Sequence, residues 1–366
     1  MIASGTGAQL TRFAETLQCP VALTIMGLGA VPTGHPLLLG PLGMHGACCA
    51  NVAVNEADLV LALGVRFDDR VIGDPAAFAQ EATIIHIDVD AREIGKNKPV
   101  HVGVHADLRA ALDQLLAIAH PIDTASWLAY LRALAKERPL TSVPDAPRLS
   151  GAHAISILAA RLPPDAIVTT GVGQHQMWAM QHLRPTRART FLSSSGFGTM
   201  GFGLPAAIGA KMAHPESVVV DIDGDGSLNM TINELSTCRR HRLGVKIFVV
   251  NNQWLGMVRQ WQDMIYAGNR VASSLADTMN AVKPAGIAAP YPDFLAIAGG
   301  YAIQSERVDS AAELEQAVTR LLADPYEPYL LDVIVEREAN VFPMIPAGKT
   351  YRDVVFDSKG GGVADT

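Results

Sequence analysis

Two short polar turns carry the residues in this chain that are best suited to chemistry. Gly224, Asp225 and Gly226 follow one apolar run, and Asn251–Asn252 follows the next. A carboxylate and an amide oxygen suit Mg²⁺ but cannot complete its ligand shell, so phosphate oxygens would have to supply the rest. The glycines let a ligand approach the backbone, and a helix beginning near Ser227 would offer free N–H groups to an anion. The turns therefore predict a diphosphate site bridged by Mg²⁺.

The segments around these turns must form a strand, a helix and a parallel strand. The runs VVVDI and VKIFVV are β-branched and apolar, which is typical of strands buried on both faces. Between them, Leu228, Ile232 and Leu235 recur at helical spacing, and the basic run Arg239–Arg242 suits the last turn of one helix. Such a unit places both turns at the carboxyl ends of adjacent strands, where ligands bind in open α/β sheets.

Composition limits the classes of protein that need to be considered. The 366 residues are 49% hydrophobic and 18% charged, which allows two or three domains with large cores. A net charge of −7, without interleaved basic and aromatic residues, does not support nucleic-acid binding. The four cysteines lack the spacing of a zinc site or a disulfide framework. Because we find no membrane-length apolar run and no signal peptide, we expect a protein of the reducing cytoplasm.

The whole chain alternates between helix and strand signals, which predicts an α/β fold with two doubly wound parallel-sheet domains. We expect a central-type domain at residues 1–118 that lacks an opening strand, and a linker at 119–150 with a helix at Ser126–Lys136 and then prolines. A second α/β domain around the two turns would span 151–340, and a C-terminal tail would span 341–366.

Several other segments are open to both a structural and a functional interpretation. The run RFDDR, which contains Arg66, Asp68 and Arg70, is either a salt-bridged surface loop or a binding site for an anionic group. The glycine-rich run around Met200 either packs on a helix or brings backbone close to a ligand. An isolated tryptophan such as Trp261 is more often part of a core than of a site.

Six segments together resemble the catalytic subunit of the acetohydroxyacid synthase (acetolactate synthase) family, whose members use thiamine diphosphate. The resemblance covers nearly the whole chain, and it depends on these motifs rather than on composition or periodicity. The segments are PLGMHG (41–46), GVRFDDRVIG (64–73), HIDVDAREIGKNK (86–98), GVGQHQMWAMQH (171–182), GFGTMGFGLPAAIGA (196–210) and NNQWLGMVRQWQ (251–262).

The resemblance implies a thiamine diphosphate site in the second half of the chain. Asp225, Asn252 and the backbone carbonyl of Trp254 match the family's Mg²⁺ ligands, although the family usually has a smaller polar residue at position 254. Met200 matches the methionine that props the aminopyrimidine over the thiazolium ring. The other residues that the resemblance assigns to this cofactor are Val172, Gly173, Gln174, His175, Gly198, Gly224, Gly226, Ser227, Gly256 and Met257.

The resemblance also implies a structural FAD and a substrate site. The residues matched to FAD are His45, Arg66, Asp68, Asp88 and Asp107, of which Asp107 could equally cap the helix that follows it. Arg70 matches the residue that holds the carboxylate of the second 2-oxo acid, as a guanidinium does well. Trp261 and Met257, one helical turn apart, match the pocket that favours 2-oxobutyrate.

The implied reaction is decarboxylation of pyruvate and condensation with pyruvate or 2-oxobutyrate, in branched-chain amino acid biosynthesis. Family members have three domains and sites between subunits, so we expect a homo-oligomer, with a small regulatory subunit as a possible partner. We also expect that this chain begins inside the middle domain and lacks the pyrimidine-binding domain with its glutamate. The alternatives are another thiamine diphosphate carboligase or decarboxylase, and an inactive fragment that binds the cofactor or a partner subunit.

Overall fold

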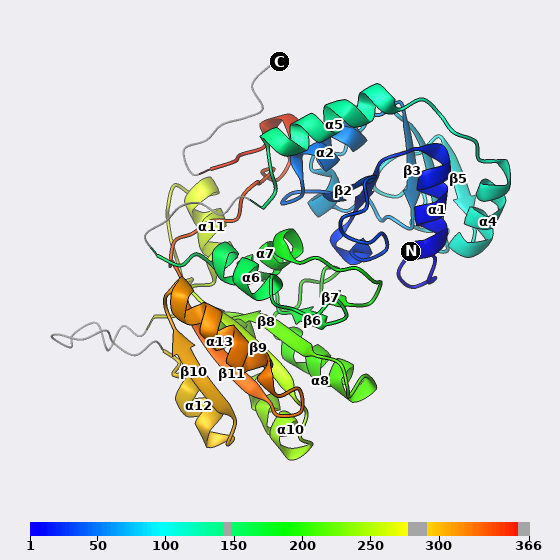
Figure 1. Ribbon diagram of the computed structural model, residues 1–366. Helices are drawn as coiled ribbons and strands as arrows, with labels where there is room; N and C mark the ends of the chain where they lie inside the picture. Colours follow the sequence, from blue (N-terminus) through cyan, green and yellow to red (C-terminus); the bar gives the residue numbers. More distant parts are fainter. Residues whose placement is uncertain (142–147, 277–290, 358–366) are drawn as a thin grey trace. The chain divides into compact units, whose positions relative to one another are not determined.

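A computed structural model describes residues 1–141, 148–276 and 291–357 of the chain (Figure 1). The chain divides into two compact units. The first comprises Met1–Ser142, Arg184–Arg189 and Val341–Thr366, and the second comprises Val143–Leu183 and Thr190–Asn340. Pairs between the named strands are parallel in both units, so the predicted α/β class with parallel sheets is confirmed.

The second unit contains a six-stranded parallel sheet in the order β10-β11-β9-β8-β6-β7. Its central strands are almost entirely buried and mostly apolar, as expected for a sheet that is covered on both faces. The strands are β6 (Ile167–Thr170), β7 (Phe191–Ser193), β8 (Val219–Gly224), β9 (Val245–Asn251), β10 (Gln304–Val308) and β11 (Tyr329–Ile334).

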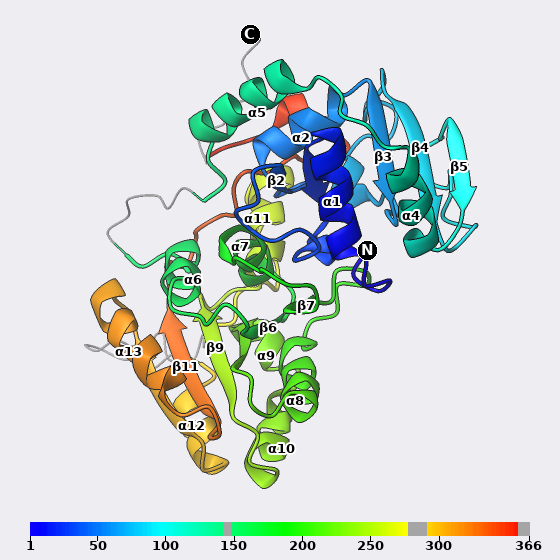
Figure 2. The same cartoon turned by 45° about the vertical axis from the view of Figure 1, so that its right-hand side comes forward.

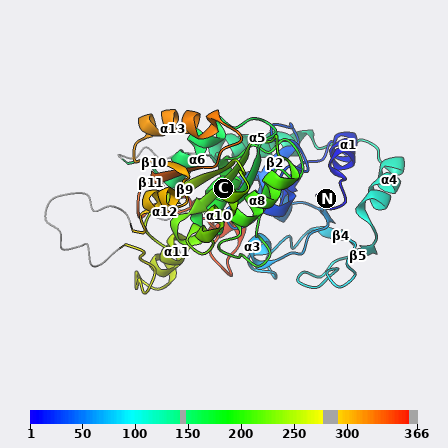
Figure 3. The same ribbon diagram turned by 90° about the horizontal axis from the view of Figure 1, so that it is seen from below.

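Helices cover both faces of this sheet, which makes the unit doubly wound. In Figure 3, α6 and α13 lie on one side of the strands, while α10 and α12 lie on the other. Helix α7 packs on α6, and α8 packs on β6 and β8. The helices are α6 (Gly151–Ala159), α7 (Gln174–His182), α8 (Gly203–Ala213), α10 (Leu235–Arg240), α11 (Gly256–Ile265), α12 (Phe294–Gly300) and α13 (Ala311–Ala323).

The single helix predicted between β8 and β9 is wrong. The chain forms the short α9 (Asp225–Leu228), a 3₁₀ turn (Ile232–Glu234) and then α10. Thr231 helps to interrupt the helix, because its hydroxyl donates to the carbonyl of Gly201 at 3.0 Å. The apolar residues Leu228 and Leu235 are nevertheless both buried, so the spacing predicted the buried face correctly but not the continuous helix.

The first unit contains two separate parallel sheets, one of two strands and one of three in the order β3-β4-β5. In Figure 2, α1 and α4 lie beside one another next to the three-stranded sheet. The strands are β1 (Val21–Leu23), β2 (Leu38–Pro41), β3 (Leu59–Leu63), β4 (Thr83–Asp88) and β5 (Val102–His105). The helices are α1 (Gly7–Leu17), α2 (Cys48–Asn55), α3 (Asp69–Ile72), α4 (Leu108–Ile118) and α5 (Ala125–Glu137), with 3₁₀ turns at Ile25–Gly27 and Tyr351–Asp353.

Parts of the expected linker and tail pack within the first unit. Helix α5 contributes Leu131, which is fully buried against α2. In the expected tail, the N–H of Ile345 donates to the carbonyl of Met44 at 2.8 Å. Buried apolar side chains hold both segments in the first unit. The sequence did not predict this packing, because both segments end in polar residues. The proline-rich part of the linker at 142–147 and the tail beyond 357 lie outside the described residues.

Among the described residues, no helix is both long and apolar enough to cross a membrane.

Candidate thiamine diphosphate site

The order of the strands creates a crevice between β6 and β8. The chain leaves β6 toward β7 on one side, and later returns to form β8 on the other side of β6. Loops from neighbouring strands diverge at such a switch point, and ligands bind outside the carboxyl ends of the strands there. The loop beginning at Gly171, the Gly224–Ser227 turn and the Asn251–Asn252 pair all lie at this end of the sheet.

The hydroxyl of Ser227 joins three loops at this crevice. Its oxygen accepts hydrogen bonds from the N–H of Gly201 at 2.9 Å and from the N–H of Val172 at 3.4 Å. Ser227 is buried, so both bonds are shielded from competition with water. This contact holds the loop after β6, the glycine-rich loop before α8 and the turn after β8 in a fixed arrangement.

Asp225 is a buried carboxylate that accepts hydrogen bonds from backbone N–H groups alone. Its two oxygens accept from Gly226 at 2.9 Å and from Gln253 at 2.7 Å. Burial raises the pKa of Asp225 to about 7, and the two N–H groups offset only part of that effect. No ion pair to Asp225 is found among the described residues. A cation bound at this position would satisfy the buried charge.

Asn252 directly precedes Gln253, whose N–H donates to this carboxylate. Its side-chain oxygen accepts from the N–H of Trp254 at 3.0 Å, within the same turn that donates to Asp225. The ring of Trp254 is flanked by the guanidinium groups of Arg270 and Arg337, at 5.3 and 5.7 Å from its centroid. These cation–π contacts fix the side chain, so the large ring packs outside the turn and leaves the backbone carbonyl of Trp254 available.

Two glycines are required where other loops come close. A Cβ on Gly224 would lie 2.6 Å from Nδ1 of His175, and a Cβ on Gly226 would lie 2.7 Å from a methyl of Leu255. The same Cβ at Gly226 would be 3.7 Å from the terminal methyl of Met200. The glycines therefore allow an imidazole and two apolar side chains to converge on the turn that carries Asp225.

These residues line one pocket, which encloses about 430 Å³ including its open part. Most of the residues expected from the sequence to bind thiamine diphosphate and Mg²⁺ are among its lining. They are Val172, Gly173, Gln174, His175, Met200, Gly224, Asp225, Gly226, Ser227, Asn252, Trp254, Gly256 and Met257.

Two expected residues do not line this pocket, and four residues that line it were not expected. Gly198 approaches Val172, since a Cβ there would lie 3.9 Å from a valine methyl. Trp261 lies one turn beyond Met257 on α11. The unexpected lining residues are Trp178, Val250, Leu255 and Val258. Helical spacing could have identified Trp178, because it shares a face of α7 with Gln174 four residues earlier.

A buried acidic pair lies on β8, the strand that ends at the pocket residue Gly224. Asp221 and Asp223 point to the same side of β8 and are both fully buried. Burial raises the pKa of Asp221 well above its ordinary value, and the neighbouring Asp223 adds to the effect. Nε2 of His175 is 3.4 Å from a carboxylate oxygen of Asp223. His175, matched by resemblance to the cofactor site, is therefore a buried residue on α7 held beside a carboxylate.

In the first unit, four of the residues expected to bind FAD lie at or just after the carboxyl ends of β3, β4 and β5. Asp88 ends β4 and accepts from the N–H of Asp90 at 2.8 Å. Asp107 caps α4 by accepting from the N–H of Arg109 at 2.8 Å. Arg66 pairs with Asp68 at 3.3 Å, so the run after β3 contains a local salt bridge.

His45 and Arg70 lie elsewhere in the first unit. His45 is buried, and its Nδ1 lies 3.0 Å from the carbonyl of Pro343. Arg70 is on α3 and lines a small pocket together with Asn51, Asn55 and Lys349. Its guanidinium contacts the sulfur of Met44 at 3.6 Å and lies 3.8 Å from Asp69.

Comparison with known proteins identifies the family to which these two units belong. Residues 1–115 match the central domain of thiamine pyrophosphate enzymes, and residues 171–333 match their C-terminal TPP-binding domain. The second match contains both turns of the crevice. The chain belongs to the thiamine pyrophosphate enzymes. The family predicted from the sequence is thus confirmed, and so is thiamine diphosphate as the cofactor of that family.

Within this family, the chain is similar to plant acetolactate synthases. It is 46% identical to "Acetolactate synthase 1, chloroplastic" of Zea mays, over 98% of this chain and 56% of that protein. It is 46% identical to "Acetolactate synthase 3, chloroplastic" of Brassica napus, over 96% of this chain and 54% of that protein. For "Acetolactate synthase, chloroplastic" of Arabidopsis thaliana, the identity is 45% over 96% of this chain and 52% of that protein. The chain spans about half the length of these relatives.

The expectation of a cytoplasmic protein is wrong by this comparison. These relatives are named chloroplastic, which contradicts the cytoplasmic location expected for this chain. The sequence argument depended on cysteine spacing and on finding neither a membrane-length apolar run nor a signal peptide. None of these features distinguishes one reducing aqueous compartment from another.

Proposed function

We propose that this chain provides the thiamine diphosphate and Mg²⁺ site of an acetolactate synthase. The proposed reaction is decarboxylation of pyruvate and condensation of the two-carbon product with a second 2-oxo acid, either pyruvate or 2-oxobutyrate. The observation that supports it most directly is the pocket at the β6–β8 switch point, where Asp225 is buried beside Asn252. Bound thiamine diphosphate would supply the nucleophilic carbon and the electron sink for the decarboxylation.

The proposed Mg²⁺ ligands are Asp225, Asn252 and the backbone carbonyl of Trp254. The residues fit this ion because Asp225 is a buried carboxylate without a cationic partner among the described residues, and the other two donors are hard oxygens in the adjacent turn. In the described part of the chain, no group of three or more His, Cys, Asp or Glu side chains could hold a metal. We therefore infer that diphosphate oxygens complete the shell.

The apolar and polar sides of the pocket would have different functions. Met200, Leu255 and Met257 present apolar surface, which would exclude water from the reacting carbon. On the polar side, the loop around Gly173 and the start of α7 would direct N–H groups at the diphosphate. His175 would contribute a further donor to the anion.

We propose that the first unit binds FAD in a structural role. Asp88 and Asp107 are carboxylates at the ends of neighbouring strands, where hydroxyl groups of a ribose are commonly held. One oxygen of Asp68 is buried without a hydrogen-bond partner among the described residues, which also fits a ligand that donates to it. Arg66 would pair with the pyrophosphate, and His45 would border the same cofactor.

Three further residues are assigned to the substrates. Arg70 would hold the carboxylate of the second 2-oxo acid, because a guanidinium presents two parallel donors to a carboxylate. Met257 and Trp261 share one face of α11, where they would shape the acceptor pocket. We also propose, by analogy with the family, that the chain forms a homo-oligomer and binds a small regulatory subunit.

The test is acetolactate formation from pyruvate by the purified chain with thiamine diphosphate, Mg²⁺ and FAD, beside an Asp225→Ala variant. Cofactor binding by calorimetry is measured in parallel. Turnover that disappears in the variant would support the whole proposal. Binding without turnover would support the cofactor site but contradict acetolactate formation by this chain alone. An absence of both would overturn the proposal.

A further inference from the structure

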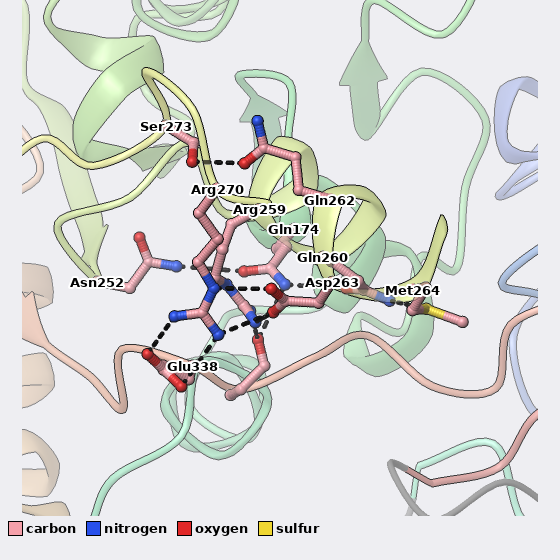
Figure 4. A network of polar contacts seen from close by, with 11 residues as sticks. Gln174, Asn252, Arg259, Gln260, Gln262, Asp263, Met264, Arg270, Ser273 and Glu338 are labelled. Atoms are coloured by element: carbon pink, nitrogen blue, oxygen red, sulfur yellow. Dashed lines mark hydrogen bonds and ion pairs between the residues drawn. The ribbon is translucent and has the colours of Figure 1, made fainter. Parts of the chain in front are cut away.

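A chain of buried amides leads away from Asn252 (Figure 4). The amide nitrogen of Asn252 donates to Oε1 of Gln174 at 3.2 Å. The amide nitrogen of Gln174 donates to Oε1 of Gln260 and to the carbonyl of Ala339, each at 2.9 Å. These contacts join α7, the turn after β9, α11 and the segment that follows β11.

A backbone carbonyl fixes the direction of this chain. The carbonyl of Ala339 can only accept, and it accepts from Gln174 and from a guanidinium nitrogen of Arg259 at 2.8 Å. The amide nitrogen of Gln174 must therefore face Ala339, which leaves its oxygen facing Asn252. Asn252 must therefore present its amide nitrogen to this oxygen. Its oxygen is consequently turned to the other side, where it accepts from the N–H of Trp254.

The surroundings hold this arrangement rigidly. Gln174 and Asn252 are 3% and 5% exposed, and Gln260 is completely buried. Arg259 is 1% exposed and forms an ion pair with Asp263 at 2.9 Å. Arg270 then bridges Asp263 and Glu338 with two contacts to each carboxylate, as Figure 4 shows. Reversing one amide would leave buried donors facing donors, which costs the full desolvation of each group.

We propose that Gln174 is a positioning residue that turns the oxygen of Asn252, rather than its nitrogen, toward the Mg²⁺ of the cofactor. This inference depends on the proposed function, because it assigns Asn252 as a metal ligand. It differs from a direct role of Gln174 at the diphosphate, since Gln174 acts through the orientation of Asn252. Partners behind a metal ligand commonly govern metal affinity in this way.

An aspartate at position 252 distinguishes a role of Gln174 in orienting residue 252 from a direct contact of Gln174 with the diphosphate. Asn252→Asp presents an oxygen in either orientation, so Gln174 has nothing left to select. Gln174→Met removes the amide at a similar volume, and it does so with the same packing change in both backgrounds. A loss that arises only from packing or from a direct diphosphate contact would appear in both.

The experiment titrates the full chain with Mn²⁺ in place of Mg²⁺ at saturating thiamine diphosphate, and measures free Mn²⁺ by electron paramagnetic resonance. We expect Gln174→Met to weaken Mn²⁺ binding about 10- to 100-fold in the native background. In the Asn252→Asp background, the same change should leave Mn²⁺ affinity unchanged or improve it, because the oxygen of Gln174 no longer opposes a carboxylate.

Gln262→Met is the matched control. Gln262 is on α11, the helix that carries Gln260, and it bonds Ser273 and the carbonyl of Val271, outside the amide chain. Its loss should not alter Mn²⁺ affinity. An equal loss from Gln174→Met in both backgrounds, or no loss in the native one, would overturn the inference and leave the proposed function standing. Failure of the unaltered chain to bind Mn²⁺ with thiamine diphosphate would overturn the proposed function and the inference together.

Discussion

Burial changes the chemistry of single side chains in both units, and His45 shows the effect most simply. The imidazole is 4% exposed, and this burial lowers its pKa from 6.5 to about 4. The unfolded chain therefore takes up a proton between pH 6.5 and pH 4 that the folded chain does not. The stability due to neutral His45 is fully present above pH 6.5 and is lost as the pH falls toward 4.

We predict that His45→Asn removes part of the acid sensitivity of the cofactor-free protein. An asparagine can still donate to Pro343 but does not titrate. Between pH 7 and pH 5, the free energy of unfolding should fall by about 2 kcal/mol less in the variant, as measured by urea unfolding. His241→Asn, at an exposed position, should behave like the native chain. Equal acid sensitivity in all three proteins would contradict the assignment.

At the scale of elements, the first residue of α11 is a position where the pocket requires a glycine although glycine is a poor helix former. Gly256 begins α11, and a Cβ on it would lie 2.7 Å from the amide nitrogen of Asn252. Gly209, in the middle of α8, has no neighbour within 4 Å of such a Cβ. Substitution at Gly209 therefore measures only the cost of glycine to helix stability, whereas substitution at Gly256 also tests the space that the pocket requires.

We predict opposite outcomes for these two glycines. Gly209→Ala should stabilise the chain by about 0.5–1 kcal/mol, because alanine is the better helix former. Gly256→Ala should push Asn252 from its position and weaken binding of thiamine diphosphate with Mg²⁺, as measured by calorimetry. Unchanged binding in Gly256→Ala would show that the pocket tolerates the extra methyl, contrary to the geometry.

A second element-scale prediction concerns the strands beside the site. Arg307 on β10 bonds Asp332 on β11 at 2.7 Å, and Asn251 at the end of β9 donates to the same carboxylate at 3.0 Å. Asp332 is fully buried, and this burial raises its pKa. Arg307→Met would leave a buried carboxylate without its cation and should destabilise the chain by about 3–5 kcal/mol.

The double variant Arg307→Met/Asp332→Leu should recover most of that loss, since it removes the uncompensated charge. Arg320, half-exposed in its pair with Glu306, offers a matched comparison at which Arg320→Met should cost far less stability, because exposed ion pairs contribute little. The measurement is the free energy of unfolding, by chemical denaturation, of the native chain, the two single variants and the double variant. A single Arg307→Met variant as stable as Arg320→Met would refute the importance of the buried pair.

At the scale of the whole molecule, the two units have separate cores and separate proposed ligands. The core of the second unit centres on its six-stranded sheet, while the clusters of the first unit surround β3, β4 and α2. The residues assigned to thiamine diphosphate all lie in the second unit. Ligand binding should therefore stabilise the two units unequally.

We predict two calorimetric unfolding transitions, of which thiamine diphosphate with Mg²⁺ shifts one. A ligand at 100 times its Kd adds about 2.7 kcal/mol to the unit that binds it. Asp225→Asn should abolish the shift and leave the other transition where it was. A single transition that moves as a whole would show instead that the units unfold together.

The sequence by itself determined the fold class, most strands and the two turns that carry Asp225 and Asn252. These features are local, because strand and helix periodicity and glycine turns depend on near neighbours along the chain. Motif resemblance added the family and thirteen residues that the pocket unites. It could not predict the broken helix before α10 or the packing of the segment after Val341, since distant side chains decide both.

Only the tertiary structure decided how the site is oriented. The partners of the buried amides are 78 residues apart for Asn252 and Gln174, and 165 apart for Gln174 and Ala339. No local pattern encodes which amide atom faces which neighbour. That choice follows from a backbone carbonyl that can only accept, in an interior where an unpaired donor is too costly to keep.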